Sequence, residues 1–283
     1  MHLLESLLLG VIQGLTEFLP ISSSGHLILA RWLFNWHLPE DAALRFDVAL
    51  HMGTLLALLG YFWRDWVRLA WAVLRGLVAR LRQPSPERSA DERRDERLAW
   101  LLVAATVPGA VFGAAGERFI EETLRQPSLV ALLLILAGLL LLVADRTGRC
   151  HRPLEGICWA DALVIGMSQA LALAPGVSRS GITITAGLFR GLNREAAARF
   201  SFLLSTPITA GAGLLQLRTF LHTGLAPAEA ASLVAGVASA AIVGVLAISF
   251  LLRFVRRYSL AVFAYYRLAL GGMTLALVLL GIK

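Results

Sequence analysis

Long apolar runs recur along the whole chain, and several of them are long enough to cross a lipid bilayer. Six helical spans are predicted, at residues 46–63, 98–116, 128–144, 200–220, 229–252 and 258–282. A membrane-spanning helix needs roughly 17 to 25 predominantly apolar residues, and these runs have about that length. The pattern therefore predicts an all-α integral membrane protein with six transmembrane helices.

Two further segments, residues 3–37 and 160–192, are apolar helical runs interrupted by proline, glycine and serine. Each half has about 14 residues, which at ~1.5 Å per residue gives ~21 Å, less than the ~30 Å of a hydrocarbon core. Because neither half can span the membrane alone, each segment is expected to go in and turn back. These segments are predicted to be two re-entrant helix hairpins.

The two hairpins also resemble one another in sequence. "GVIQGLTEFLPISSSG" from Gly10 and "GMSQALALAPGVSRSG" from Gly166 align without gaps. The paired residues include Gln13 with Gln169, Ser22 with Ser178, Ser24 with Ser180 and Gly25 with Gly181. Chance similarity between apolar sequences is the alternative to a true repeat.

Such a repeat divides one membrane domain, residues 1–283, into halves of approximately 1–145 and 146–283. Each half would hold one hairpin and three spans. Since three is odd, the second half would be inserted upside down relative to the first. Inverted-topology repeats place their binding site where the broken helices meet, near the middle of the membrane.

Composition agrees with this class, and charge indicates the orientation. The chain is 57% apolar and 16% charged, with a mean hydropathy of +0.70 and a formal net charge of +7. Its arginines gather in particular loops, which is typical of membrane topology, and no nucleic-acid partner is expected. Loop 82–97 is predicted to be cytoplasmic, whereas the glutamate-containing loop 117–128 is predicted to be outside. A helical pattern at 64–81 precedes the first of these loops, and its tryptophan and arginine group at 63–75 is expected to be an interfacial helix. The first hairpin then starts from the outer face and the second from the inner face.

The tip of the first hairpin, "LPISSSGH", is a candidate anion site. Pro20 ends the incoming helix, and Ser22, Ser23 and Ser24 are suited to cap the returning one. The free backbone N–H groups and the positive end of that helix point toward the same place. Ser22 and Ser24 are therefore candidates for substrate binding, and His26 follows Ser23 on the same helical face.

The tip of the second hairpin, "PGVSRSGIT", repeats this design with Ser178 and Ser180 and adds Arg179. A guanidinium near the middle of a membrane is costly unless it is paired or hydrated, and its planar donors match phosphate oxygens. Two helix N-termini and an arginine at one place favour a ligand that carries more than one negative charge.

Glu17 lies directly behind the first tip, on the same helical face as Gln13. A carboxylate in this position can bind a divalent cation or act as a general base. The alternative is a structural ion pair between Glu17 and Arg179. On the next span, His51 and Asp47 are candidates to line the same cavity.

The segments "QGLTEFLPISSSGH" and "PGVSRSGIT" resemble the two signature segments of the bacterial undecaprenyl-diphosphate phosphatases, also known as bacitracin-resistance phosphatases. The similarity continues through "FDVALHMGT", "YFWRDW" and "RFSFLL" and covers essentially the whole chain. The resemblance implies hydrolysis of undecaprenyl diphosphate to undecaprenyl phosphate and phosphate, which recycles the lipid carrier for cell-wall polymers. It places the protein in the bacterial cell (inner) membrane, among membrane lipids, with the active site open to the outer, periplasmic face.

The resemblance also implies roles for individual residues. Glu17 would be the essential carboxylate, Ser23 and His26 would act at the phosphoryl centre, and the diphosphate would be held by Ser178, Arg179, Ser180 and Thr183. A divalent cation, Mg²⁺ or Ca²⁺, would be bound by Glu17 with Gln13, although many members have a second glutamate where this chain has Gln13. Bacitracin would compete for the polyprenyl diphosphate substrate, and a homodimer is a further expectation.

The residues leave the attacking group open among Ser23, His26 and water, and the preferred assignment is a nucleophilic Ser23 with His26 as acid and base. A rival function is an inverted-repeat transporter or flippase for a lipid phosphate or anion. The Ser-x-x-His pair beside Glu17 favours the phosphatase, because a transporter needs no nucleophile. A lipid phosphatase of the vanadium-haloperoxidase type is disfavoured, since the only lysine is Lys283.

Overall fold

The computed structural model describes residues 3–36, 40–81, 88–148, 151–223 and 227–282, and these residues form helices and short connections. The α-helices are α1 (Leu3–Phe18), α2 (Ser23–Phe34), α3 (Glu40–Tyr61), α4 (Trp63–Leu81), α5 (Ala90–Thr123), α6 (Pro127–Thr147), α7 (Trp159–Ser168), α8 (Arg179–Phe189), α9 (Arg194–Thr223), α10 (Pro227–Phe254) and α11 (Ala261–Leu279). Two 3₁₀ turns, Leu154–Gly156 and Leu171–Leu173, flank α7. The all-α prediction is confirmed for the described residues.

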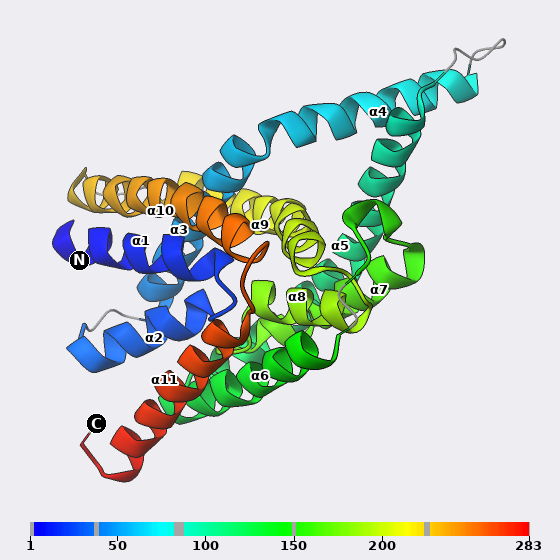
Figure 1. Cartoon of the computed structure of the whole chain (residues 1–283). Coiled ribbons are helices and arrows are strands. Elements are labelled where there is room, and N and C mark those ends of the chain that lie inside the picture. Colours follow the sequence, from blue (N-terminus) through cyan, green and yellow to red (C-terminus); the bar gives the residue numbers. More distant parts are fainter. Residues whose placement is uncertain (1–2, 37–39, 82–87, 149–150, 224–226, 283) are drawn as a thin grey trace.

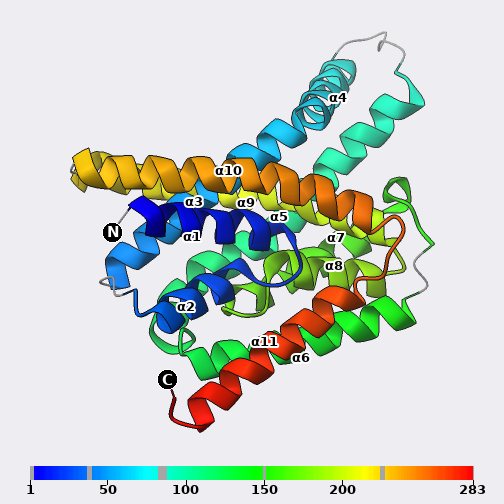
Figure 2. The same cartoon turned by 60° about the vertical axis from the view of Figure 1, so that its left-hand side comes forward.

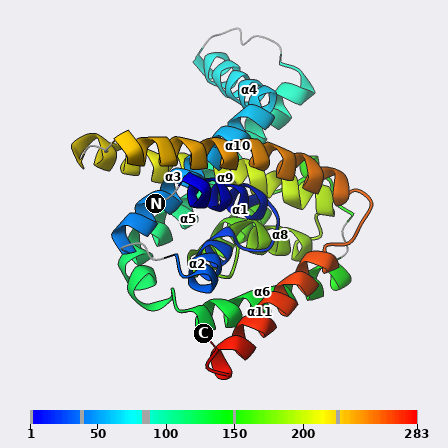
Figure 3. The ribbon, with the colours of Figure 1, turned by 90° about the vertical axis from the view of Figure 1, so that its left-hand side faces the viewer.

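Both predicted hairpins are present as broken helices that meet inside a ring of longer ones. The first is α1 and α2, which are interrupted at Leu19–Ser22, and the second is α7 and α8, which are interrupted between residues 169 and 178. Figure 3 shows α1, α2 and α8 at the centre, with α9 and α10 on one side and α6 and α11 on the other. The turns of the broken helices are buried within this arrangement, at residues 20–22 and 175–178.

The membrane-capable helices agree only partly with the six predicted spans. Within the described residues, four helices are long and apolar enough to cross a membrane: 90–115, 127–147, 230–254 and 261–279. The bent pair of α3 and α4 raises this number to five at most. The predicted spans 46–63 and 200–220 lie in α3 and α9, where polar side chains such as Asp47, His51 and Thr209 face other protein segments and lower the hydropathy.

A sharp bend of 72° separates α3 from α4 at Phe62. The predicted helix at 64–81 is confirmed, and Figure 1 shows α4 extending away from the bundle toward the N-terminal part of α5. Most of its large apolar side chains are exposed, including Trp71 at 59%, whereas Leu69 is buried. Arg75 donates to Glu92 on α5 at 2.5 Å, and Arg80 donates to Glu96 at 2.8 Å. An exposed apolar side and an ion-paired polar side support the expected interfacial position of α4.

Glycines allow each hairpin to pack closely against a helix from the other half of the chain. α1 packs along α10, while α7 packs along α5 (Figure 2). A Cβ on Gly10 would lie 2.3 Å from the carbonyl oxygen of Gly236, and one on Gly166 would lie 2.6 Å from that of Ala105. These two glycines are the first pair of the predicted repeat, so the equivalent positions make equivalent close contacts.

Candidate active site

The tips of the two hairpins are bonded directly to each other. Ser22 Oγ accepts the backbone N–H of Gly176 at 3.1 Å, across the two turns. In the other direction, Ser180 Oγ lies 3.1 Å from the carbonyl oxygens of both Glu17 and Leu19, to which it can donate. Two segments that are more than 150 residues apart in the sequence therefore form one structural unit.

Each tip begins its returning helix with the same serine cap. Ser22 has φ 77° and accepts the N–H of Gly25 at 3.3 Å, and Ser178 has φ 73° and accepts that of Gly181 at 3.0 Å. A positive φ is uncommon for a residue other than glycine and is held only where surrounding contacts fix it. The two caps are equivalent positions of the predicted repeat. The first N–H groups of an α-helix have no carbonyl partner within the helix, so the start of α2 and the start of α8 each offer donors beside these caps.

Glu17 is the centre of the polar contacts at the tips. Its Oε2 atom accepts from Ser23 Oγ at 2.5 Å and from Gln13 Nε2 at 3.0 Å, and it lies 3.4 Å from His51 Nε2. Its Oε1 atom accepts from the guanidinium of Arg179. The Glu17 side chain is only 5% exposed. A buried carboxylate of this kind is stable only when it is paired and hydrogen-bonded, as it is here.

Arg179, the first residue of α8, joins the second tip to this carboxylate. Besides Glu17, its guanidinium donates to Thr209 Oγ1 on α9 at 2.7 Å. The side chain is 18% exposed, so it is more accessible than its partner. The ion pair between Glu17 and Arg179, which the sequence suggested as an alternative to a catalytic role of Glu17, is therefore present. It lies between the two capped helix N-termini. This position also suits anion binding, because the guanidinium donors can be redirected toward a phosphate.

The remaining predicted residues of the second tip have mainly internal contacts. Ser178 caps α8, and its Oγ lies 3.2 Å from that of Ser180. Thr183 Oγ1 lies 2.7 Å from the carbonyl oxygen of Arg179 and 2.7 Å from Ser201 Oγ, and this residue is 1% exposed. Ser180 and Thr183 thus hold α8 in place against α1 and α9. The first tip matches this arrangement, since Ser24 Oγ lies 3.4 Å from Ser22 Oγ.

The His26 ring is hydrogen-bonded to groups other than the hydroxyl of Ser23. Its Nδ1 atom lies 2.7 Å from the carbonyl oxygen of Ser22, so this nitrogen carries the proton and donates. Its Nε2 atom is 2.8 Å from the hydroxyl of Tyr266, and the two rings are stacked with centroids 5.6 Å apart. Ser23 Oγ turns back to Glu17 on α1, whereas His26 faces α11. The predicted acid–base pairing of His26 with Ser23 therefore lacks the contact it needs in this geometry.

His51 and Asp47 were both candidates to line the cavity, and the structure separates them. His51 Nε2 faces Glu17, while its Nδ1 donates to the backbone oxygen of Asp47 at 2.7 Å. The Asp47 carboxylate instead accepts from Arg31 on α2 and lies 3.5 Å from Arg125. Its charge ties α2 to α3 and does not join the polar contacts of Glu17.

Arg267 was not selected from the sequence, yet it lies beneath both tips. This α11 residue has no measurable exposure, and its guanidinium donates only to backbone oxygens among the described residues. The acceptors are Pro20 at 3.1 Å, Gly176 at 2.8 Å, Val177 at 2.9 Å and Leu134 at 3.2 Å. It therefore fixes both turns and adds a positive charge below the anion site. The sequence signal that could have identified Arg267 is the presence of an arginine inside the apolar run 258–282.

The polar groups at the tips offer oxygen ligands of the kind that Mg²⁺ and Ca²⁺ take. Gln13 Oε1 is buried and has no hydrogen-bond partner among the described residues. It lies on the side chain whose nitrogen already donates to Glu17. No group of three or more His, Cys, Asp or Glu side chains suited to a metal occurs in the part of the chain that the structure describes. These residues fit a cation only if a ligand such as a phosphate supplies further oxygens.

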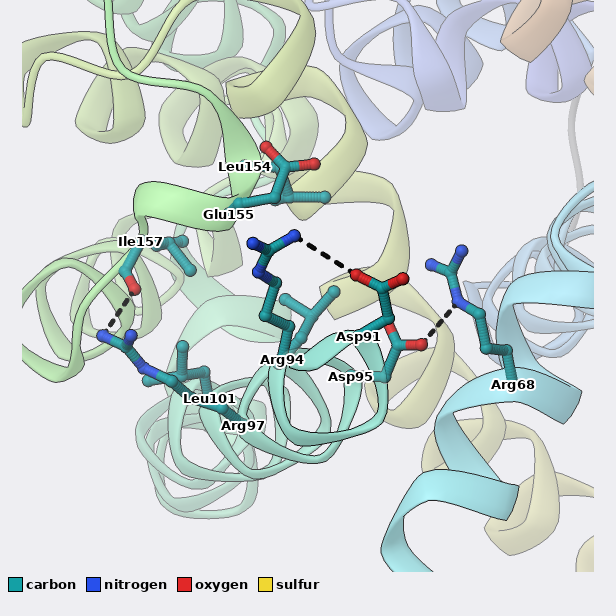
Figure 4. A pocket seen from close by; sticks show the side chains of 10 residues that line it. Arg68, Asp91, Arg94, Asp95, Arg97, Leu101, Leu154, Glu155 and Ile157 are labelled. Atoms are coloured by element: carbon teal, nitrogen blue, oxygen red, sulfur yellow. Dashed lines mark hydrogen bonds and ion pairs between the residues drawn. The ribbon is translucent and has the colours of Figure 1, made fainter. Parts of the chain in front are cut away.

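A second pocket lies far from the tips, between α4, the start of α5 and the turn Leu154–Gly156 (Figure 4). Its charged lining residues are three arginines, Arg68, Arg94 and Arg97, and three carboxylates, Asp91, Asp95 and Glu155. Arg68 bonds to Asp95 at 3.0 Å, and Arg94 bonds to Asp91 at 3.3 Å. Because its opposite charges compensate each other, this pocket lacks the net positive charge that a phosphate needs.

Comparison with known proteins gives the family. The family model described as bacitracin resistance protein BacA matches residues 6–273. An undecaprenyl-diphosphatase of Moorella thermoacetica is 50% identical over 278 residues, which cover 98% of this chain and 98% of that protein. One from Rubrobacter xylanophilus is also 50% identical, over 99% of this chain and 100% of that protein, and one from Geobacter sulfurreducens is 49% identical over 98% of each. Since the matched region runs through both hairpins and the helices that surround them, this chain belongs to the bacitracin resistance protein BacA family.

Proposed function

We propose that this protein is an undecaprenyl-diphosphatase of the cell membrane, which converts undecaprenyl diphosphate to undecaprenyl phosphate and inorganic phosphate. The observation that carries the proposal is the contact of Ser23 and Arg179 with one buried carboxylate, Glu17, between two capped helix N-termini. This arrangement combines a nucleophile, a proton acceptor and positive charge for a diphosphate. The names of the relatives, at about half identity over nearly full length, support the same activity.

The first chemical step follows from the Ser23–Glu17 hydrogen bond of 2.5 Å. Ser23 Oγ forms a bond to the terminal phosphorus, the bond from that phosphorus to the bridging oxygen breaks, and undecaprenyl phosphate leaves. The Ser23 proton passes to Glu17. Water then attacks the phosphoserine, the bond from phosphorus to Oγ breaks, Glu17 returns its proton to Ser23, and the second proton of the water passes to solvent.

Charge at the transferred phosphoryl group is stabilised by fixed positive groups. Phosphoryl transfer depends on positioning and charge neutralisation more than on covalent machinery. The Arg179 guanidinium exchanges Glu17 for phosphate oxygens, and the N-terminal ends of α2 and α8 add the partial positive charge of their helix dipoles. Arg267 supports these groups from below by holding the backbone of both turns.

A divalent cation is proposed to be held by Glu17 and the unpartnered Gln13 Oε1, with the diphosphate supplying the other oxygens. When bound, it neutralises phosphate charge. We expect Gln13→Glu, which adds a second carboxylate, to lower the Mg²⁺ concentration for half-maximal activity about tenfold, and Gln13→Leu to raise it by a similar factor. Chelation of the metal is expected to abolish turnover.

The shift in thermal unfolding on Mg²⁺ titration provides a readout of metal binding that does not depend on activity. Gln169→Leu is the matched control, because Gln169 is the repeat equivalent directly after α7 and donates to Ala105 O at 2.9 Å. It should leave the metal requirement unchanged. Identical Mg²⁺ dependence in wild type and both Gln13 variants would contradict the proposed ligand.

The proposed membrane orientation rests on charge. Figure 1 shows both chain termini at the end of the molecule opposite to the last turn of α4 and the first turn of α5, and the connection between these helices belongs to the predicted cytoplasmic loop 82–97. By the positive-inside rule, that connection is cytoplasmic, and the first hairpin opens to the outer, periplasmic face of the inner membrane. The two hairpins then belong to inverted repeats, which the matched serine caps and glycine contacts support. Residues 82–87 of the predicted cytoplasmic loop lie outside the described residues, and residues 90–97 are not a loop but the first turns of α5. Residues 117–123 of the predicted outer loop are likewise the last turns of α5. A proposed homodimer is tested by cross-linking in membranes.

The activity is tested by phosphate release from C15 or C55 isoprenyl diphosphate, with purified protein in detergent and added Mg²⁺ or Ca²⁺. We expect bacitracin to inhibit this release, because it would compete for the substrate. The transporter alternative is tested in liposomes with labelled lipid phosphate. Movement of lipid between leaflets without phosphate release would overturn the phosphatase proposal.

The nucleophile is tested by acid quenching after milliseconds of reaction with substrate that is ³²P-labelled on the terminal phosphate. We expect label on the peptide that contains Ser23, and none in Ser23→Ala. Ser168→Ala is the control, because the Ser168 hydroxyl donates within its own helix, to Ile165 O. In this variant the peptide that contains Ser23 should still be labelled. Full turnover by Ser23→Ala would show that water or another group makes the attack.

A further inference from the structure

A second feature of the structure lies immediately beside the active site. An apolar groove of about 310 Å³ runs between α1, α2 and α11. Its walls include Ile12 and Leu15 from α1, Leu29 and Leu33 from α2, and Leu270 and Met273 from α11. None of the described residues that line it is an Asp, Glu, Lys or Arg. The groove therefore fits an uncharged hydrocarbon chain.

The few polar side chains of the groove wall are satisfied within the protein. Thr16 Oγ1 donates to Ile12 O at 2.7 Å, and Thr274 Oγ1 donates to Leu270 O at 2.9 Å. Both hydroxyls thus bond to their own helices and require nothing from a ligand. His26 and Tyr266 also line the groove, and the Nε2 atom of His26 lies 2.8 Å from the hydroxyl of Tyr266, so these two side chains are hydrogen-bonded to each other.

The groove is continuous with the catalytic residues through His26. This residue lines the groove, and its backbone N–H donates to Ser22 O at 3.1 Å within the tip of the first hairpin. On the facing helix, Tyr266 directly precedes Arg267, whose guanidinium holds both turns. The inner end of the groove is therefore within one helical turn of Ser23. From His26 the groove follows α2 as far as Phe34, about 12 Å at ~1.5 Å per residue.

We propose that this groove binds the first isoprene units of the polyprenyl diphosphate, with the diphosphate end at the His26–Tyr266 pair. The inference rests on the proposed function and assigns His26 and Tyr266 to the boundary between the polar and apolar parts of the substrate. A chain seated here leaves the groove at the lipid-facing side chains of Leu33 and Met273, which are 43% and 53% exposed. The rest of a long chain then continues into the bilayer.

The test fills the groove away from the catalytic residues. Ala30 lies one turn beyond His26 on α2, and Met273 lies two turns beyond Tyr266 on α11. In Ala30→Trp and Met273→Trp, the indole occupies space that a C15 chain needs and a C5 chain does not reach. We expect KM for C15 isoprenyl diphosphate to rise about tenfold, which corresponds to losing the burial of about two carbons. KM for C5 isoprenyl diphosphate and kcat for both substrates should change less than about twofold.

Val262→Trp is the matched control. Val262 lies on the same helix as Met273, has nearly the same exposure, at 52% against 53%, and lies outside the groove. It should leave both KM values unchanged. The inference is overturned if Ala30→Trp and Met273→Trp behave like Val262→Trp. It is also overturned if they weaken both substrates equally, or if they change only the oligomeric state, because the groove would then be a protein interface.

Binding without turnover separates this inference from the proposed function. Retention of radiolabelled C15 isoprenyl diphosphate by detergent-solubilised protein is measured at 4 °C in the presence of a chelator. Weaker retention by Ala30→Trp but not by Val262→Trp supports the groove even if the wild type were to release no phosphate. Equal retention by all three proteins overturns the groove while leaving phosphate release as a separate result.

Discussion

Glu17→Gln is expected to lower phosphate release from C15 isoprenyl diphosphate by at least about 10³-fold. The amide keeps the size of the side chain but cannot accept the Ser23 proton, and it removes the charge that faces Arg179. The effect should appear in kcat, because the carboxylate acts on the reacting hydroxyl. The measurement is initial-rate release of inorganic phosphate across a substrate titration, with Mg²⁺ in excess.

Folding must be followed in the same variant. Removing one partner of a buried ion pair costs roughly 3–5 kcal/mol, since the other charge is left uncompensated. Thermal unfolding in detergent therefore accompanies the kinetics, and rates are compared only below the transition. Glu195→Gln, which removes an exposed carboxylate bonded to Arg256 at 2.5 Å, is the control and should retain full activity. If Glu17→Gln is folded and its kcat is within tenfold of the wild-type value, the proposed role of Glu17 is wrong.

Arg179→Lys is expected to lower kcat/KM for the same substrate by about 10²- to 10³-fold. Lysine keeps the positive charge but replaces a planar fork of donors with a single ammonium. In the structure this fork contacts Glu17 and Thr209 at the same time, so it spans two helices beside the diphosphate position. A charge without this geometry should neutralise the phosphate yet fail to orient it.

Arg256→Lys is the matched control, because Arg256 is 58% exposed and pairs only with Glu195 among the described residues. Its activity should equal that of wild type. Because charge is retained in Arg179→Lys, a loss of activity there reports geometry, whereas Arg179→Met removes both properties and should be worse. Equal activity in Arg179→Lys and wild type would mean that a positive charge alone suffices, and the proposed bidentate contact would be wrong.

Much of the site could be identified from sequence because its residues are local to two short motifs. Pro20, the serine caps and Arg179 depend on turn chemistry within a few residues, and a lone carboxylate or arginine in an apolar helix is conspicuous. The alignment of Gln13 with Gln169 and of Ser22 with Ser178 also predicted which positions would be equivalent. The caps at Ser22 and Ser178 have nearly the same φ and the same hydrogen bond.

Apart from the Glu17–Arg179 ion pair, the partners of these residues could not be predicted, because they come from distant segments. The spacing of Ser23 and His26 indicated a catalytic pair, yet the first bonds to Glu17 and the second to Tyr266 on α11. His51 and Asp47 are on the same helix, four residues apart, but only His51 reaches Glu17. Rotamers and helix packing decide these contacts, and neither is visible in a linear pattern.

The sequence by itself determined the helical membrane class, the two broken hairpins and the identity of the tip residues. These follow from hydropathy, from proline and serine chemistry and from charge, all of which act over a few residues. Only the tertiary structure decided that Ser22 bonds to Gly176, that Arg267 supports both turns, and that an apolar groove begins at His26. The physical reason is that buried polar groups must find partners wherever packing brings them, so the pairing of the two tips is a property of the whole helix arrangement.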